Sequence, residues 1–197
     1  MTIRPLTRWL ALVTVILVSG CVVYRYVPPT GEPNAAQRRS ADSLSALREA
    51  DLARILVQDA GQRRPRLTRN PVLDSVARAR AWDMARRNYF SHVNPDGLGP
   101  NRLVEAAGYR LPPEYDQRPT GNDIEAAAAG YGTARQAWGW FMRSPRHRAH
   151  LLGLDARGLA QTEFGIGYAW RPQTRYGHYW VVLIARPDTT QPSPPVR

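Results

Sequence analysis

The residues best suited to chemistry in this chain are its four histidines and one glutamate in an apolar stretch. The histidines are His92, His147, His150 and His178, and Glu125 begins a segment in which four alanines follow the acid. Imidazole serves as a metal ligand and as a general acid or base near neutral pH. A buried carboxylate needs a cationic or hydrogen-bonding partner. These residue types are therefore the chain's candidates for a polar site.

The local sequence around each histidine predicts where its ring lies. His92 follows the end of a predicted helix and precedes a Pro-Asp-Gly turn. His147 lies in the first turn of a helix that starts at Pro145, where the positive helix end keeps imidazole neutral, as a metal requires. His150 is either a second residue of the site or an exposed neighbour. His178, at a strand start, is either a surface residue or part of a cleft rim.

Two kinds of site are open if two of these histidines and Glu125 converge. One is a zinc site that leaves a position for water, with the carboxylate as a ligand or as the group that orients one. Alternatively, they form a hydrogen-bonded cluster without metal. Other chemistries find little support, because the sequence holds no Gly-x-Ser-x-Gly elbow and no phosphate-binding glycine loop. A glycosidase pair would need a second acid beside Glu125, for which Asp96 and Glu163 are the candidates.

The apolar periodicity predicts helices first and a hairpin last. Asn70 and Pro71 start a helix that runs to about Asn88, and Thr133 caps another helix. Residues 164–170 alternate as a strand does, and residues 179–185 form the nearly continuous apolar run of a buried strand. This order without strict alternation indicates an α+β fold.

The first 21 residues indicate export. Arg4 and Arg8 precede an apolar run from Trp9 to Val18, which is too short to cross a bilayer and is typical of a secretory signal peptide. Val18-Ser19-Gly20-Cys21 resembles a bacterial lipobox, in which the cysteine is lipidated and becomes the mature amino terminus. The alternative is an uncleaved anchor with an incidental cysteine. A single cysteine excludes a disulfide framework.

These features predict four segments: a signal peptide at 1–20, a lipidated cysteine and tether at 21–44, one domain at 45–186 and a proline-rich tail at 187–197. The net charge of +11 comes from arginine alone, since the sequence contains no lysine. For an exported, membrane-anchored protein, the available polyanions are headgroups and cell-wall polymers rather than nucleic acid. A solvated surface without a partner is the alternative.

Several motifs in order resemble the bacterial branch of the CAP (or SCP) domain, the family of cysteine-rich secretory, antigen 5 and plant pathogenesis-related proteins. They are Ser91-His92-Val93-Asn94-Pro95-Asp96-Gly97, Phe141-Met142-Arg143-Ser144-Pro145-Arg146-His147-Arg148, and Gly165-Ile166-Gly167-Tyr168 with Tyr179-Trp180-Val181. The resemblance covers about residues 45–186.

The chain departs from the family pattern at several positions. Where the pattern has Gly-Glu-Asn-Ile, counting without gaps places Glu125, not Asp123, on the glutamate. Phe141 replaces a tryptophan, and Arg146 replaces a glycine. The second glutamate of eukaryotic members has no clear counterpart. The carried-over cluster is therefore His92, Glu125 and His147, with His92 and His147 as the tentative metal ligands.

The resemblance implies an α-β-α sandwich with a mainly antiparallel sheet, and it leaves three functions open. One is a non-catalytic binding module with a His/Glu cleft for a small apolar or glycan ligand, with or without a divalent metal such as zinc. Another is a metal-dependent hydrolase of cell-wall peptide or glycan, with Glu125 as general base. The last is an adhesive or structural envelope protein that uses its basic surface.

Overall fold

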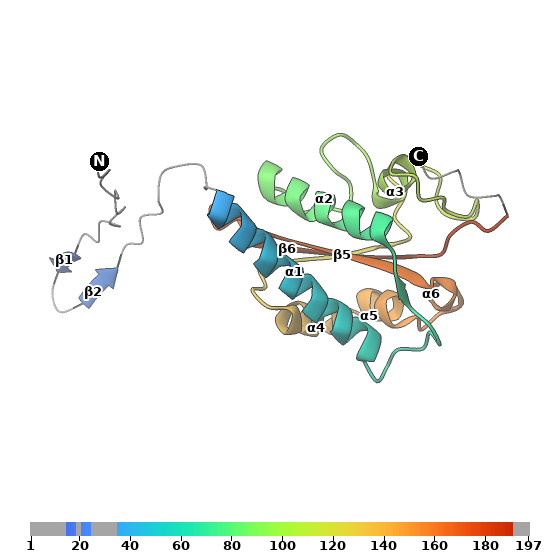
Figure 1. The fold of residues 1–197 in the computed structure, drawn as a ribbon, viewed down its shortest axis with the longest axis horizontal. Helices are drawn as coiled ribbons and strands as arrows, with labels where there is room; N and C mark the ends of the chain where they lie inside the picture. Colours follow the sequence, from blue (N-terminus) through green and yellow to red (C-terminus); the bar gives the residue numbers. More distant parts are fainter. Residues whose placement is uncertain (1–14, 19–20, 25–34, 191–197) are drawn as a thin grey trace, which may run out of the picture. The chain divides into compact units, whose positions relative to one another are not determined.

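A computed structural model describes residues 15–18, 21–24 and 35–190, and their side chains from residue 42 onward. Figure 1 shows the elements in chain order. They are β1 Val15–Val18, β2 Cys21–Tyr24, α1 Ala35–Gln58, β3 Thr68–Arg69, α2 Pro71–Arg87, α3 Pro100–Ala106, β4 Glu125–Ala129, α4 Ala134–Arg143, α5 Pro145–Leu152, α6 Ala156–Ala160, β5 Glu163–Trp170 and β6 His178–Ala185.

The domain is built around a sheet with the order β3-β5-β6-β4. Strands β5 and β6 form an antiparallel hairpin, and β4 pairs antiparallel with β6. Only the two-residue strand β3 runs parallel to its neighbour, β5. The sheet is therefore mixed but mainly antiparallel, which confirms the predicted α+β class.

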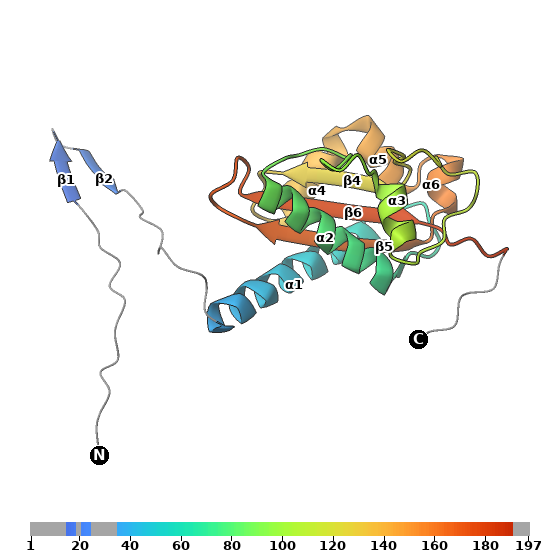
Figure 2. The same cartoon turned by 90° about the horizontal axis from the view of Figure 1, so that it is seen from above.

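Helices cover both faces of this sheet. Side chains of β6 alternate between the two cores, with Trp180 and Val182 on one face and Val181 and Leu183 on the other. Helices α1, α4 and α5 pack on the first face, and α2 and α3 on the second, as Figures 1 and 2 show. Because both faces are buried, the apolar run of β6 is nearly continuous. This is the predicted α-β-α sandwich.

Two glycines let α2 lie directly on the sheet. A Cβ at Gly165 would come within 2.1 Å of the backbone of Leu73, and one at Gly167 equally close to the backbone of Ala77. No real side chain tolerates that distance, so the alternation of glycine along β5 serves helix packing. The contact fixes the position of α2, and with it one side of the predicted site.

The helix boundaries follow from their caps. Asn70 accepts hydrogen bonds from the first turn of α2, and Asn88 ends that helix in the left-handed conformation. Thr133 and Gln136 form a capping box at the start of α4. Ser144 both ends α4 and caps α5. These are the helices that the sequence predicts at Pro71, Thr133 and Pro145.

The N-terminal part differs from the prediction in one respect. Helix α1 begins at Ala35, whereas residues 21–44 were expected to form a tether. The segment from Ala35 onward is rich in alanine, glutamine and arginine, which favour helix. Strands β1 and β2 pair antiparallel with each other, and Val18 lies opposite Cys21.

The predictions for residues 1–14, 19–20, 25–34 and 191–197 lie outside the described residues, so the signal peptide and the lipobox stay predictions. Within the part of the chain that the structure does describe, no helix has the length and apolar character to cross a membrane.

Candidate functional site

Glu125 and His92 meet at the start of strand β4. Glu125 is the first residue of that strand, and its side chain is fully enclosed. Nδ1 of His92 lies 2.9 Å from Oε1 of Glu125. A carboxylate only accepts, so Nδ1 of His92 carries the hydrogen and its Nε2 is left as the acceptor of the neutral ring. Because 45% of the His92 side chain is exposed, that nitrogen is presented toward solvent.

A buried arginine holds the other side of the same carboxylate. Nε of Arg80, on helix α2, donates to Oε2 of Glu125 at 3.1 Å, and only 3% of the arginine side chain is exposed. Burial is the largest single influence and disfavours the cation, but the charge and hydrogen bond of Glu125 together with those of Tyr89 outweigh it and raise the pKa of Arg80 above its ordinary value. Glu125 is therefore a carboxylate that is paired with a buried cation and held in position by it.

Arg80 also fixes the backbone that carries His92. Its Nη2 donates to the carbonyl oxygens of Ser91 at 2.9 Å and His92 at 3.1 Å. Its Nη1 donates to the hydroxyl of Tyr89, which donates to Asp83. Burial raises the pKa of Tyr89 above its ordinary value. One guanidinium thus ties α2, the loop after it and β4 into one network.

Sequence reasoning missed Arg80, although a signal for it was present. The buried face of α2 includes Leu73, Ala77 and Met84, and position 80 falls on the same helical stripe. An arginine on an apolar helix face needs a buried acceptor, and Glu125 was the buried acid without a named partner. Pairing the two would have predicted the contact.

His147 lies beside this network in an aromatic setting. Its ring centroid is 5.0 Å from that of Trp140 and 5.4 Å from that of Phe141. Burial, and then the charges of His92 and Arg146, lower its pKa below the ordinary value. Nδ1 of His147 is buried and has no hydrogen-bond partner.

The other two histidines take structural positions. Nε2 of His150 lies 3.1 Å from the carbonyl oxygen of Ile124, and burial lowers the pKa of this ring to about 4. His150 is thus neither an exposed neighbour nor a free ligand. Nδ1 of His178 accepts a hydrogen bond from the hydroxyl of Tyr168 at 2.7 Å. Tyr168 in turn accepts one from Arg48.

The donor set does not complete a zinc site with three protein ligands. Among the described residues, no three His, Cys, Asp or Glu side chains are grouped so that they could hold a metal ion. Glu125 is engaged by Arg80, which leaves the imidazoles of His92 and His147 as ligands. Zinc sites use three or four protein ligands. Zinc binding through these two histidines stays a prediction.

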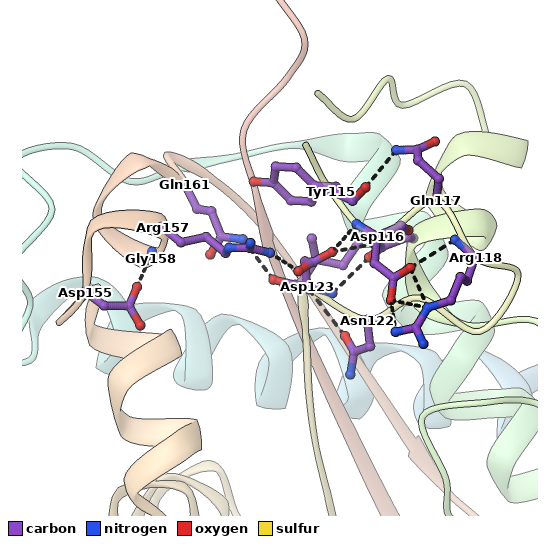
Figure 3. Close-up of polar contacts among 12 residues, drawn as sticks. Tyr115, Asp116, Gln117, Arg118, Asn122, Asp123, Asp155, Arg157, Gly158 and Gln161 are labelled. Atoms are coloured by element: carbon purple, nitrogen blue, oxygen red, sulfur yellow. Dashed lines mark hydrogen bonds and ion pairs between the residues drawn. The ribbon is translucent and has the colours of Figure 1, made fainter. Parts of the chain in front are cut away.

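Asp123, the other acid of the motif region, belongs to a different network (Figure 3). Its Oδ2 accepts from the side chain of Asn101 at 2.9 Å and from the backbone N–H of Asp116 at 2.6 Å. Its Oδ1 pairs with Arg157, and its carbonyl oxygen accepts from Gln161. These bonds hold the loop before β4 against α6. Asp123 is an anchor of that loop, and Glu125 is the acid that contacts His92.

The tryptophans divide between the core and the surface. Trp138 and Trp180 are buried, as expected for core residues, and Trp140 is half-buried beside His147. Trp82 and Trp170, however, are 39% and 47% exposed.

The fold and the histidine–glutamate site together define a member of the CAP class. The sequence model of the Cysteine-rich secretory protein family (CAP) matches residues 24–184, so the chain belongs to this family. No curated protein matches the chain.

A solved structure shows the same fold, and two further ones are similar to parts of the chain. An extracellular protein containing an SCP domain from Bacillus anthracis str. Ames is 19% identical over 84% of this chain, with a TM-score of 0.56. This chain spans about half of that protein, 47% of its length. A cysteine-rich secretory protein from Staphylococcus aureus is 14% identical over 72% of this chain and 40% of its own, with a TM-score of 0.48. An outer surface protein from Borrelia burgdorferi is 17% identical over 77% and 92% of the two chains, with a TM-score of 0.46.

Proposed function

We propose that the chain is an exported, lipid-anchored CAP module that binds a small apolar or glycan ligand beside His92 and His147 without transforming it. The observation that carries this proposal is the buried pair of Arg80 and Glu125. A general base needs a carboxylate oxygen free to take the proton, and both oxygens of Glu125 are already engaged, Oε2 by Nε of Arg80 and Oε1 by Nδ1 of His92. Glu125 instead orients His92 through Nδ1.

The surroundings of His147 suit a ring-shaped or apolar ligand. Trp140 is half-buried and lies against both His147 and Tyr131. Aromatic faces of this kind stack on sugar rings and on apolar groups. The unpartnered Nδ1 of His147 supplies a polar group beside them. The pairing of aromatic surface with one convergent polar atom is typical of small-molecule sites.

Export to the cell envelope rests on the basic and apolar start of the chain followed by Cys21. Two of the similar proteins are described as an extracellular protein and an outer surface protein. Lipid on Cys21 would place the domain at a membrane, and membrane lipid or cell-wall glycan would then be the ligands within reach.

Two probes test the binding proposal. The full chain is titrated with chitotriose as the glycan and with laurate as the apolar ligand, while NMR follows the imidazoles of His92 and His147. We expect saturable shifts with one probe and, because His147→Ala removes the imidazole from the site, about a tenfold weaker affinity in that variant, equivalent to about 1.4 kcal/mol. His178→Ala, outside the site, is the matched control and retains the parent affinity.

Two results would overturn the binding module. One is the absence of saturable shifts with both probes. The other is release of products from purified peptidoglycan by the parent but not by Glu125→Gln, which would establish the hydrolase instead.

A metal-assisted version is favoured by one observation, the buried Nδ1 of His147, which has no hydrogen-bond partner. Zinc titration by calorimetry on the full chain tests it, and the expected result is binding that His92→Ala and His147→Ala each abolish. An unchanged isotherm in both variants would assign the zinc to other groups.

A further inference from the structure

One hollow of the domain is lined by none of His92, Glu125 and His147. It has a volume of about 400 Å³ and is lined along helix α4 by Arg135, Gly139 and Arg143, with Tyr131 and Thr133 at the start of the helix. Ligand pockets commonly begin at about 300 Å³. A Cβ at Gly139 would meet nothing within 4 Å, so the glycine leaves the floor of this hollow open.

Arg135, Gly139 and Arg143 form one stripe of α4. Residues four apart lie on the same helix face, one turn above the other. With a rise of 1.5 Å per residue, the two arginines start about 12 Å apart along the axis, on either side of Gly139. Both side chains can therefore bend over the middle turn toward one group.

These arginines lack the partners that other arginines of the chain have. On α2, Arg78 pairs with Glu49 and Arg80 with Glu125. From Ala126 to Leu154, the sequence contains no acid at all. Among the described residues, no side-chain ion pair or hydrogen bond involves the four exposed arginines of this stretch: Arg135, Arg143, Arg146 and Arg148.

The positions of Arg135 and Arg146 are electrostatically unfavourable for helices α4 and α5. Helix N-termini favour acids and disfavour cations. Yet the first turns of α4 and α5 contain no acid, and Arg135 and Arg146 occupy them. A local preference that is broken without a compensating contact marks a functional position. An anion over the start of α4 supplies the missing compensation for both the helix end and the arginines.

We propose that the hollow over Gly139 binds a phosphate group, held between the guanidinium groups of Arg135 and Arg143. The planar fork of arginine matches phosphate oxygens with two parallel hydrogen bonds. Two guanidinium groups line this hollow, which shares Tyr131 with the aromatic surroundings of His147 but is lined by none of His92, Glu125 and His147. It is a separate site from the one proposed above, and its ligand is recognised by charge.

Titration with inorganic phosphate tests the site directly. NMR follows the backbone amide of Gly139 in the full chain, with sodium chloride at equal ionic strength as the blank. We expect a saturable shift with phosphate only, and at least a tenfold weaker affinity in Arg135→Gln/Arg143→Gln. The matched control, Arg171→Gln/Arg175→Gln, removes the same charge from two exposed arginines of the β5–β6 turn and stays within twofold of the parent.

A third variant separates the hollow from charge alone. Gly139→Leu keeps both arginines and fills the open floor, so its phosphate affinity also falls about tenfold. The proposal is overturned if the parent shift does not saturate, if the two double variants weaken binding equally, or if Gly139→Leu binds as the parent does.

Binding to vesicles distinguishes a lipid headgroup from a soluble phosphate as the source of the phosphate group. Sedimentation compares the two double variants on phosphatidylcholine vesicles that contain a third of phosphatidylglycerol. A larger loss of binding in Arg135→Gln/Arg143→Gln than in the control assigns the site to a lipid headgroup. An equal loss, with the difference in the phosphate titration intact, assigns it to a soluble phosphate. Both outcomes support the phosphate site.

Discussion

At the residue scale, Glu125 is defined by its two partners. Arg80 neutralises the carboxylate within the core, and His92 extends it toward solvent. Removing both charges of a buried pair is tolerated far better than removing one, because the survivor is left uncompensated. The same pairing that argues against Glu125 as a base therefore makes it sensitive to mutation.

Arg80→Leu tests this balance. The variant leaves Glu125 buried without its cation, and we expect the free energy of unfolding to fall by roughly 3–5 kcal/mol. Urea denaturation measures the change. Arg86→Gln, on an exposed face of the same helix, loses less than about 0.5 kcal/mol. The double variant Arg80→Leu/Glu125→Leu regains only part of the loss, because the carbonyl oxygens of Ser91 and His92 still lack their donor. A double variant as unstable as the single one would contradict the assignment.

The buried imidazole of His150 makes stability depend on pH. Burial, followed by the charge of Arg64, lowers its pKa from 6.5 to about 4. Between those values the unfolded chain binds a proton that the native ring does not. The free energy of unfolding is therefore highest above pH 6.5, where the ring is neutral in both states. It falls by an amount on the order of 3 kcal/mol as the pH decreases toward 4.

His150→Gln isolates that contribution, since its amide can still donate to the carbonyl of Ile124. Charged and titratable groups that act on this ring include His147 and Asp155 as well as Arg64, and all three are unchanged in the variant. Urea denaturation from pH 7 to pH 4 should show a shallower loss in the variant. Parallel curves for parent and variant would place the titration elsewhere.

At the element scale, the architecture depends on close approach between α2 and β5. Gly165 and Gly167 let the helix backbone contact the strand backbone. The same helix carries Arg80, so the distance between helix and sheet determines whether the guanidinium reaches Glu125. Packing and site geometry are therefore coupled through two glycines.

Gly167→Ala tests this coupling. The added methyl would lie 2.1 Å from the backbone of Ala77, so the helix must move or the strand must bend. We expect the free energy of unfolding to fall by about 1–3 kcal/mol, the range for overpacked cores. Gly139→Ala is the matched control, because its methyl meets open space and favours helix by up to about 1 kcal/mol. Thermal unfolding of both variants should shift in opposite directions.

The elements also show how far the sequence could be interpreted. Capped, periodic helices such as α2 and α4 were predicted because their caps and apolar spacing are local. Strand β4 was not predicted, because its alanines favour helix. They form a strand because β6 pairs with them and both faces are covered, with Ala126 in one core and Ala127 in the other. Small side chains fit there, but only the tertiary structure shows it.

The candidate site was likewise predicted from the sequence only in part. His92 and Glu125 were brought together by the resemblance to the family motifs, and the structure places Nδ1 of His92 2.9 Å from Oε1 of Glu125. Arg80 and the burial of His150 depend on partners 45 and 26 positions away, which no local pattern specifies. Long-range pairing of charges is the part that sequence reasoning could not supply.

At the scale of the whole molecule, one thiol decides where the domain would work. Cys21 is the only cysteine of the chain and follows the apolar run that predicts export. Acyl chains on that thiol would hold the protein at a membrane, beside lipid and cell-wall ligands. Without them, the domain would diffuse away from both.

Cys21→Ser removes the acceptor of that lipid while changing one atom. Expressed in a bacterium that processes lipoproteins and fed an alkyne-tagged fatty acid, the parent should carry the label and sediment with membranes. The variant should lose the label, because a hydroxyl cannot form the thioether, and should either accumulate uncleaved or appear in the soluble exported fraction. Tyr24→Phe, three positions on, keeps the thiol and should behave as the parent does. Equal labelling of the parent and Cys21→Ser would show that the lipid is attached elsewhere or that the label is not specific. The phosphate hollow and the His92 region would then have to find their ligands without a membrane tether at Cys21.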